Sequence, residues 1–253
     1  MSAPIAVVLG AGGAIGTECC RAFAAAGYRV AAGDIRHAQA RRAIDGLPHA
    51  PVAAGIDVCD PDALVAWARE VAALGNVTAL VYAPGLVMTS AIERTDWARY
   101  RRLMAVNLDG AFHAAAAFVP VMRDQETAAA IVLLSSTAGK RGEAGASQYC
   151  ASKFGLIGLG ESLAAELVPA RIRVNMICPG NVDTPMLRQV ADEIAAYRGL
   201  DAAAVWESMF RSGAAIRLVQ PAEVAAACVW LCDARLSATT GATLTVDAGA
   251  MLG

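Results

Sequence analysis

Short apolar segments alternate with longer segments of helical periodicity along almost the whole chain. Because the short segments are apolar at consecutive positions, they are typical of strands that are buried on both faces. The segments between them, for example 62–73 and 148–167, place their apolar residues on one side of a helix. This alternation predicts a parallel sheet that helices cover on both faces. The expected strands are 5–9, 29–33, 52–56, 79–82, 130–134, 171–177 and 243–246.

Composition adds the number of domains and a hint about assembly. The 253 residues contain no repeat, linker or composition break, so we expect one α/β domain over 1–253 with a doubly wound, seven-stranded parallel sheet. Charged residues make up only 17% of the chain, below the roughly 25% of an average soluble domain. This low charge suggests that other subunits cover part of the helix surface.

Charge, hydropathy and cysteine usage argue against several classes of protein. The net charge is −2 and no basic block occurs, so neither nucleic acid nor an anionic membrane surface is an expected partner. No run of about 20 apolar residues offers a membrane span, and the apolar N-terminus lacks the basic flank of a signal peptide. The seven cysteines form no CxxC pair and the three histidines lie far apart. We therefore expect no metal site, and reduced thiols in a soluble, cytoplasmic protein.

A glycine-rich loop follows the first expected strand. The sequence L-G-A-G-G-A-I-G places Gly10, Gly13 and Gly16, with Ile15, directly before a helix. Glycines permit the sharp turn and close backbone approach that a pyrophosphate requires, and a helix N-terminus favours its negative charge. A tight turn alone would also explain the glycines. After the first strand of an α/β chain, however, the loop indicates the dinucleotide site of a Rossmann fold.

Acidic residues follow at the ends of the second and third expected strands. Asp34 lies 18 residues after Gly16, where a carboxylate accepts hydrogen bonds from both ribose hydroxyls of NAD and repels the 2′-phosphate of NADP. We therefore predict NAD as the cofactor, although Asp34 would also suit the cap of the next helix. Asp57 would similarly face the adenine ring, or serve only the local turn.

The second constellation is a tyrosine and a lysine on one helix. The chain has only two lysines, Lys140 and Lys153, among 21 basic residues, and Lys153 follows Tyr149 by four positions. At this spacing the two side chains share a helix face. An ammonium about 4 Å from a phenol, at an effective dielectric of about 20, favours the phenolate by about 4 kcal/mol and would bring its pKa from about 10 towards 7. Such a phenol is a general base for an alcohol proton, although a solvated helix face would also give the spacing.

Two polar residues elsewhere favour the catalytic interpretation. The pair Ser135–Ser136 stands at the end of the fifth expected strand, and Ser136 lies 13 residues before Tyr149. Asn107 lies in a mostly apolar helix, where a buried amide needs a hydrogen-bond partner.

Together these motifs resemble the short-chain dehydrogenase/reductase family, and the resemblance covers essentially the whole chain. Several motifs match besides the glycine loop. They are Asp57–Val58, V-N-L-D-G at 106–110, S-S at 135–136, Y-C-A-S-K at 149–153, V-N-M-I-C-P-G-N-V-D-T-P-M at 174–186 and L-T-V-D-A-G at 244–249.

The resemblance implies a role for each matching residue. Tyr149 would be the acid/base, and Lys153 would lower its pKa and hold the nicotinamide ribose. Ser136 would orient the substrate oxygen, and Asn107 would support a proton-relay water. The remaining cofactor contacts implied are Val58, Gly85, Pro179, Gly180, Val182 and Thr184.

The chain departs from the family pattern at the cofactor end. Leu9 stands where the family has threonine, Ala14 replaces a motif glycine, and Tyr82-Ala83-Pro84-Gly85 replaces Asn-Asn-Ala-Gly. These departures bear on the affinity for the cofactor, and none of them affects Asn107, Ser136, Tyr149 or Lys153.

Substrate specificity is expected from two segments. The loop between Ser136 and Tyr149 contains Glu143, whose carboxylate would repel acids and accept hydrogen bonds from hydroxyls. We therefore favour a diol or polyol, and the segments resemble those of NAD-dependent sorbitol, galactitol and acetoin/butanediol dehydrogenases. Glu143 could equally be an exposed charge or pair with Arg141. The second segment, an apolar insertion at about 183–218 that includes Met186, Trp206, Met209 and Phe210, is a candidate substrate lid.

Two alternative functions remain. One is an NADPH-dependent 3-ketoacyl-thioester reductase, which Asp34 disfavours. The other is a non-catalytic nicotinamide-nucleotide sensor, which would be expected to lack some of the four residues Asn107, Ser136, Tyr149 and Lys153, all present here. By the same resemblance we expect a homotetramer or a dimer, formed through the helices that contain Asn107 and Tyr149.

Overall fold

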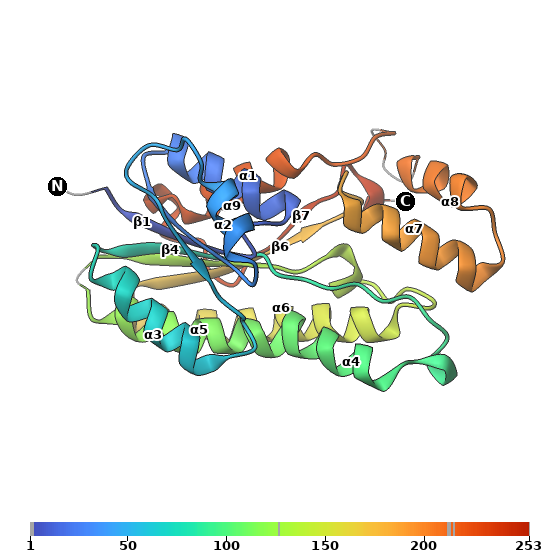
Figure 1. The fold of residues 1–253 in the computed structure, drawn as a ribbon, viewed down its shortest axis with the longest axis horizontal. Helices are drawn as coiled ribbons and strands as arrows, with labels where there is room; N and C mark the ends of the chain where they lie inside the picture. The colour runs from blue at the N-terminus through green and yellow to red at the C-terminus, as the bar shows by residue number, and fades with distance from the viewer. Residues whose placement is uncertain (1–2, 126, 212–213, 215, 253) are drawn as a thin grey trace.

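A computed structural model describes residues 3–125, 127–211, 214 and 216–252. Within them the chain forms the predicted parallel sheet of seven strands, in the order β3-β2-β1-β4-β5-β6-β7, between two layers of helices (Figure 1). The strands are β1 (Ile5–Leu9), β2 (Arg29–Asp34), β3 (Val52–Gly55), β4 (Val77–Tyr82), β5 (Ala129–Leu134), β6 (Ile172–Pro179) and β7 (Thr243–Val246).

The sheet is buried on both faces, as its apolar strands predict. In β1, Ile5, Val7 and Leu9 point into one hydrophobic core, while Ala6 and Val8 point into the other. The first core packs against the layer of α3, α4, α5 and α6, and the second against α1, α2 and α9 (Figure 1). These helices are α1 (Ala14–Ala25), α2 (His37–Ala43), α3 (Pro61–Ala72), α4 (Trp97–Met104), α5 (Gly110–Arg123), α6 (Ser147–Leu167) and α9 (Pro221–Cys232).

All seven predicted strands are confirmed, and the largest differences in their bounds, of two residues each, are at the start of β4 and at the end of β6. Strand β6 continues through Pro179 because Pro179 still pairs with Val246 of β7 and the next amide, that of Gly180, donates to the Val246 carbonyl (3.0 Å). Proline is tolerated there because it needs to donate no ladder hydrogen bond. The extension carries the chain directly to the edge of the sheet where parallel strands end.

Helices α4 and α5 are joined by a π-helical turn, Ala105–Asp109. Among the described residues, the combined run Trp97–Arg123 is long and apolar enough to cross a membrane by length and composition, and 44% of its most apolar window is buried inside the molecule. The run packs against α3 and α6 and supplies Asn107 to the interior. One side of the run therefore packs against the body of this fold, while other residues of it, such as Phe112, are exposed.

The predicted lid contains two helices that extend beyond the sheet at its carboxyl edge (Figure 1). They are α7 (Pro185–Arg198) and α8 (Ala202–Phe210), which share a small hydrophobic cluster of their own. Trp206 and Met209 belong to that cluster, and the Arg188 guanidinium lies 4.3 Å from the centre of the Trp206 ring. Positions 212, 213 and 215 of the predicted lid lie outside the described residues.

Candidate active site

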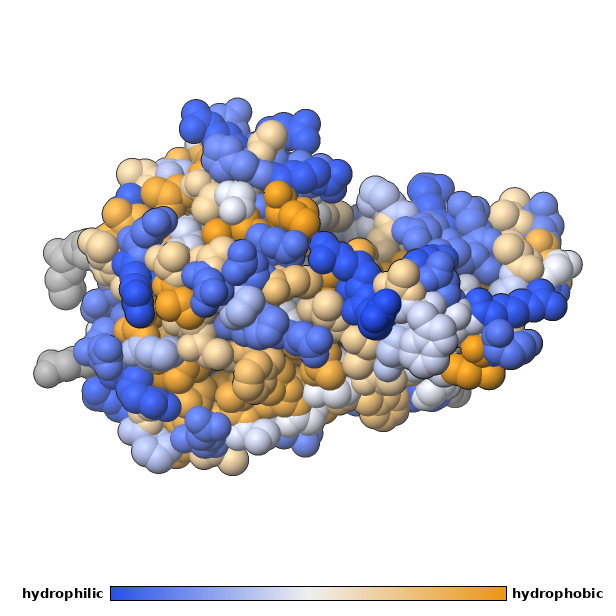
Figure 2. Space-filling model, turned by 60° about the horizontal axis from the view of Figure 1, so that its bottom comes forward, coloured by the Kyte–Doolittle hydropathy of each residue, from blue (hydrophilic) through white to orange (hydrophobic). Residues whose placement is uncertain are grey.

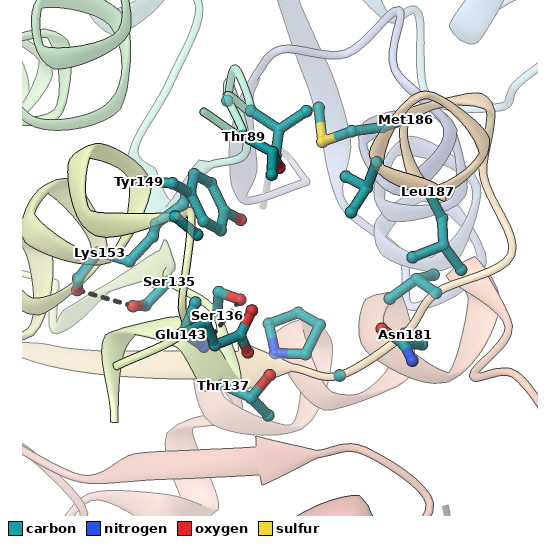
Figure 3. A pocket seen from close by; sticks show the side chains of 18 of the residues that line it. Thr89, Ser135, Ser136, Thr137, Glu143, Tyr149, Lys153, Asn181, Met186 and Leu187 are labelled. Carbon is teal, nitrogen blue, oxygen red and sulfur yellow. Dashed lines mark hydrogen bonds between the residues drawn. The ribbon is translucent and has the colours of Figure 1, made fainter. Parts of the chain in front are cut away.

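The carboxyl ends of β4, β5 and β6 enclose a cavity of about 420 Å³ beneath α7 (Figure 3). This is the edge where open α/β sheets bind their ligands. The cavity brings together eleven residues that the sequence predicts at a site. They are Ile15, Gly85, Ser136, Glu143, Tyr149, Lys153, Pro179, Gly180, Val182, Thr184 and Met186.

Ser136 and Tyr149 present their hydroxyl groups to the same part of the cavity (Figure 3). Ser136 lies two residues after the end of β5, and its Oγ accepts the Ala138 N–H (3.1 Å) at the start of the 3₁₀ turn Thr137–Gly139. Tyr149 lies in the first turn of α6. A strand end and a helix start therefore fix the two hydroxyls, and both groups can contact one oxygen of a bound molecule.

Lys153 lies one helical turn beyond Tyr149 and is almost completely buried. Its Nζ donates to the Leu134 carbonyl (2.9 Å) and lies 5.7 Å from the centre of the Tyr149 ring. The Lys153 carbonyl accepts the Ser135 hydroxyl (2.9 Å), and a side chain at Gly139 would collide with the same carbonyl. These contacts hold α6 against the end of β5 and so fix the positions of Tyr149 and Lys153 relative to the sheet.

The predicted lowering of the Tyr149 pKa by Lys153 is wrong for the protein alone. Burial raises the pKa of the Tyr149 phenol to about 12, and the nearby Ser136 hydroxyl opposes this shift only in part. Burial also lowers the pKa of the Lys153 ammonium to about 8. Desolvation therefore outweighs the attraction between the two groups, because the ammonium is directed at the Leu134 carbonyl rather than at the phenol oxygen.

Asn107 is completely buried in the π-helical turn, and its amide has three protein partners. Its Oδ1 accepts the Leu86 N–H (2.8 Å), and its Nδ2 donates to the Leu86 carbonyl (2.9 Å) and to Ser152 Oγ (3.0 Å). The side chain thus ties the loop after β4 to α6 and lies outside the cavity lining. In this structure Asn107 is a positioning residue, and its support of a water molecule stays a prediction.

The glycine loop forms a close backbone turn before α1, as predicted. Gly10 has a φ of +73°, and a side chain there would meet the Pro84 nitrogen at 2.7 Å. A Cβ at Gly16 would collide with the Gly10 carbonyl oxygen. The N-cap residue of α1 is Gly13, which has no side chain to cap the helix, so the first N–H groups of α1 can bind an anion. The loop therefore fits a dinucleotide pyrophosphate.

A second, shallower cleft lies where α1 and α9 begin. It is lined by Gly12, Gly13 and Ala14 from the glycine loop and by Gln220 and Pro221 from α9. Ala14, the departure from the family's glycine, thus faces this cleft. Ile15, by contrast, faces the main cavity.

Asp34 ends β2 and supports the glycine loop from the side. Its Oδ2 accepts the Gly12 N–H and its Oδ1 accepts the Arg36 N–H, both at 3.0 Å. Helix α2 begins at His37 with Arg36 at its cap and without a side-chain cap bond, so Asp34 is not the cap of α2. The carboxylate lies beside the glycine loop, as an adenosine ribose site requires.

Asp57 and Val58 have clear local roles in the structure. Asp57 Oδ1 accepts the Cys59 N–H (3.0 Å), and its Oδ2 lies 3.7 Å from the Arg102 guanidinium. Val58 is buried, and its carbonyl contacts the His113 ring nitrogen (3.2 Å). Their contact with adenine stays a prediction.

Other contacts stand in for the side-chain hydrogen bonds of the family's Asn-Asn-Ala-Gly segment. The Tyr82 hydroxyl donates to the Val106 carbonyl and anchors the end of β4 to the π-helical turn. The Ala83 N–H donates to the Leu9 carbonyl (3.1 Å), and Pro84 lies directly against Gly10. The loops after β1 and β4 are thus held together without asparagine.

On the far side of the cavity, the turn after β6 leads into the lid. A side chain at Gly180 would meet the Asp247 Cβ at 2.7 Å, which explains the glycine. Thr184 caps α7, since its Oγ1 accepts the Leu187 N–H (3.2 Å). Val182 forms an isolated bridge to Val219 and is buried.

The substrate end combines one carboxylate with two arginines. Although much of the Glu143 side chain is exposed, its carboxylate points into the cavity beside Ser136 (Figure 3). Desolvation there raises the pKa of the Glu143 carboxyl, while Arg141 and Arg198 oppose the shift. No ion pair joins Glu143 to Arg141 among the described residues.

Several lining residues escaped prediction from the sequence. They come mainly from α7, whose cavity-facing residues recur at helical spacing, and from the loop after β4. The sequence predicts the lid and the loop after Ser136 only as segments, and finding these residues would have required knowing which side of α7 faces the cavity. They are Val87, Thr89, Arg141, Leu187, Val190, Ile194 and Arg198.

Known proteins of similar sequence and structure match the chain almost from end to end. The family model described as "Enoyl-(Acyl carrier protein) reductase" matches residues 10–251. Galactitol 2-dehydrogenase (L-tagatose-forming) of Cereibacter sphaeroides is 39% identical, over 96% of this chain and 93% of that protein. 2-Keto-3-deoxy-L-fuconate dehydrogenase of Xanthomonas campestris pv. campestris is 32% identical, over 96% of this chain and 78% of that protein.

A solved short-chain type dehydrogenase/reductase from Mycobacterium marinum has a TM-score of 0.89 and 26% identity, covering 100% of this chain and 97% of that one. Fold, motifs and relatives thus agree. The chain belongs to the short-chain dehydrogenase/reductase family, whose members are oxidoreductases that use a nicotinamide cofactor.

Proposed function

We propose that the protein is an NAD-dependent dehydrogenase that interconverts a secondary alcohol, in particular a diol or polyol, and its ketone. The observation that carries this proposal is the convergence of the Ser136 and Tyr149 hydroxyls in a cavity that reaches Ile15, next to the glycine loop (Figure 3). The cofactor, when bound, supplies the acceptor or donor of the hydride. The protein supplies proton transfer, orientation and substrate selection.

Tyr149 is the proton donor and acceptor in this proposal. With a pKa of about 12 in the protein alone, the phenol is protonated at neutral pH and ready to donate to a ketone oxygen. Alcohol oxidation requires this pKa to fall when the other components of the complex are bound. Lys153, whose pKa is lowered to about 8, is still mostly charged at pH 7 and stabilises the phenolate. Ser136 holds the substrate oxygen within reach of Tyr149.

Asp34 is the basis for proposing NAD rather than NADP. Its carboxylate lies beside the glycine loop and is fixed by two backbone N–H groups. A 2′-phosphate at this place would meet a like charge, whereas ribose hydroxyls would donate hydrogen bonds. We therefore expect a higher kcat/KM with NAD than with NADP.

Glu143 and the relatives support a polyhydroxylated substrate. The carboxylate extends into the cavity beside Ser136 (Figure 3), where a hydroxyl neighbouring the reacting carbon could donate to it. The similar galactitol 2-dehydrogenase is named for a polyol. In Glu143→Gln we expect KM for polyols to rise about tenfold, the order for loss of a charge-assisted hydrogen bond, while KM for a simple secondary alcohol stays unchanged. Equal kinetics of the wild type and Glu143→Gln on polyols would show that Glu143 does not recognise the substrate.

A thioester reductase is the second candidate, because the matching family model is described as "Enoyl-(Acyl carrier protein) reductase". A panel of polyols, vicinal diols and simple secondary alcohols with NAD, run beside acetoacetyl-CoA with NADPH, distinguishes the two. NADH formation with polyols supports the proposal. Turnover restricted to the thioester with NADPH would contradict it, and cofactor binding without any turnover would favour a sensor.

We further propose that the enzyme is a homotetramer, or a dimer, in the cytoplasm. Hydrophobic residues gather on the face formed by the α5–α6 layer (Figure 2). They include Phe112, which is 57% exposed, and Phe154, which is 46% exposed. Multi-angle light scattering should give a mass of four or two chains of 26.0 kDa, and a monomer would contradict the proposal.

A further inference from the structure

Glu193 lies on α7 outside the cavity lining, yet its carboxylate has partners on three different segments. Its Oε2 accepts the backbone N–H of Thr89 (2.7 Å), in the loop after β4. Its Oε1 accepts from the Arg99 guanidinium of α4 (2.9 Å) and from Gln189 of its own helix (3.0 Å). The carboxylate therefore joins the lid helix to two parts of the body of the protein.

The position of Glu193 relative to the cavity gives this contact a consequence. Leu187, Val190 and Ile194 of α7 line the cavity, and Glu193 occupies the neighbouring side of the same helix. Its partner Thr89 does line the cavity and lies beside Met186 of α7 in Figure 3. Any movement of α7 away from Thr89 thus changes the wall that faces a substrate.

A second contact, near the end of α7, joins the lid helix to the loop that contains Glu143. The Tyr197 ring packs on Gly145, so closely that a side chain there would meet Tyr197 at 2.8 Å. The Gly145 carbonyl in turn accepts the Ser90 N–H (2.8 Å). The loop after β4, the Glu143-containing loop and α7 thus form one closed ring of contacts, and Glu193 supplies its charged contact.

We propose that Glu193 is a positioning residue for substrate recognition, which holds α7 against Thr89 and so sets the width of the cavity between Thr89 and Met186. An exposed ion pair alone would contribute little, and the Arg99 side chain is 51% exposed. The bond from the Thr89 amide differs, because it is part-buried and its acceptor is charged, which makes it one of the stronger kinds of hydrogen bond. The effect on substrate rests on the proposed function, whereas the effect on α7 does not.

The test compares Glu193→Gln and Glu193→Ala with Glu207→Gln as matched control. Glu207 forms an ion pair with Arg211 on α8, within the same lid but away from Thr89. Hydrogen–deuterium exchange of the free protein reports on α7 and on residues 86–91 without any substrate. We expect exchange in both segments to become about tenfold faster in Glu193→Ala and less so in Glu193→Gln, the order for losing one hydrogen bond to a charged group. Exchange in the sheet should not change in either Glu193 variant, and exchange in α7 and residues 86–91 should not change in Glu207→Gln.

Kinetics with the best substrate of the alcohol panel complete the test. We expect KM for the alcohol to rise about tenfold in Glu193→Ala while KM for the cofactor stays within about twofold. Unchanged exchange in α7 would overturn the proposal whatever the kinetics show. Faster exchange with an unchanged KM for the alcohol would overturn the role of Glu193 in substrate recognition. If the wild type shows no turnover, the proposed function is refuted, and the exchange result still decides whether Glu193 holds α7.

Discussion

Lys153→Met is expected to change the pH dependence of stability in a defined way. The side chain is 4% exposed, and burial lowers the pKa of its ammonium from 10.5 to about 8. Below pH 8 the folded and unfolded states both carry the proton, so folding bears the full cost of burying the charge. Between pH 8 and 10.5 the unfolded state binds more protons than the folded state, and the stability therefore rises with pH.

The two pKa values set the size of this effect at about 3 kcal/mol, of which about 2 kcal/mol is recovered by pH 9.5. Methionine fills a similar volume without a charge, but it leaves the Leu134 carbonyl without the Lys153 donor, at a cost of about 1 kcal/mol. At pH 7 the variant should thus be about 2 kcal/mol more stable than the wild type.

Urea unfolding at pH 7, 8, 9 and 9.5 measures this difference. The advantage of Lys153→Met should shrink steadily above pH 8 and be nearly gone at pH 9.5. This range stays below pH 10, where the unfolded state begins to release the Tyr149 proton that the folded state holds to about pH 12. Parallel curves for the two proteins over the whole range would refute the reasoning that desolvation dominates at Lys153.

Two further predictions concern the cofactor end. In Asp34→Asn the preference for NAD over NADP, measured as a ratio of kcat/KM values, should fall by a factor of about ten to a hundred. The reason is that two like charges about 5 Å apart repel by about 3 kcal/mol at an effective dielectric of about 20, less solvent screening. An unchanged ratio would show that Asp34 does not face the 2′ position. In Gly16→Ala the new Cβ meets the Gly10 carbonyl oxygen, a backbone atom that no rotamer can relieve, so we expect a loss of about 2 kcal/mol in the free energy of unfolding and NAD binding weakened at least about tenfold by fluorescence titration. A variant that binds NAD normally would mean that the loop has room to rearrange.

The sequence predicts the sheet well because each strand is apolar on both faces and each interval has helical periodicity. It also predicts which residues meet at the carboxyl edge, since Ser136, Tyr149 and Pro179 lie at or near the ends of elements whose order the pattern defines. The sequence does not predict how strongly burial changes the electrostatic environment of the two catalytic side chains. The spacing of Tyr149 and Lys153 predicts attraction, whereas their burial and the direction of Lys153 towards Leu134 reverse the expected shift of the phenol pKa.

Contacts between segments far apart in the chain are the other feature that the sequence does not predict. Asn107 was recognised as a buried amide, but its two hydrogen bonds to Leu86 depend on the loop after β4 folding over the π-helical turn. Thr89 and Glu193 are 104 positions apart and carry no motif. Only the placement of α7 over the cavity reveals that they meet.

The central claim is that Tyr149 transfers the proton in an NAD-dependent oxidation, and Tyr149→Phe tests it most directly. Initial rates of NADH formation should be measured with the best alcohol of the panel, together with NAD binding by fluorescence. We predict that kcat falls by about 10²–10⁴, the usual contribution of a general acid–base group, while the Kd for NAD changes less than about threefold. A variant that forms NADH at the wild-type rate would contradict the account.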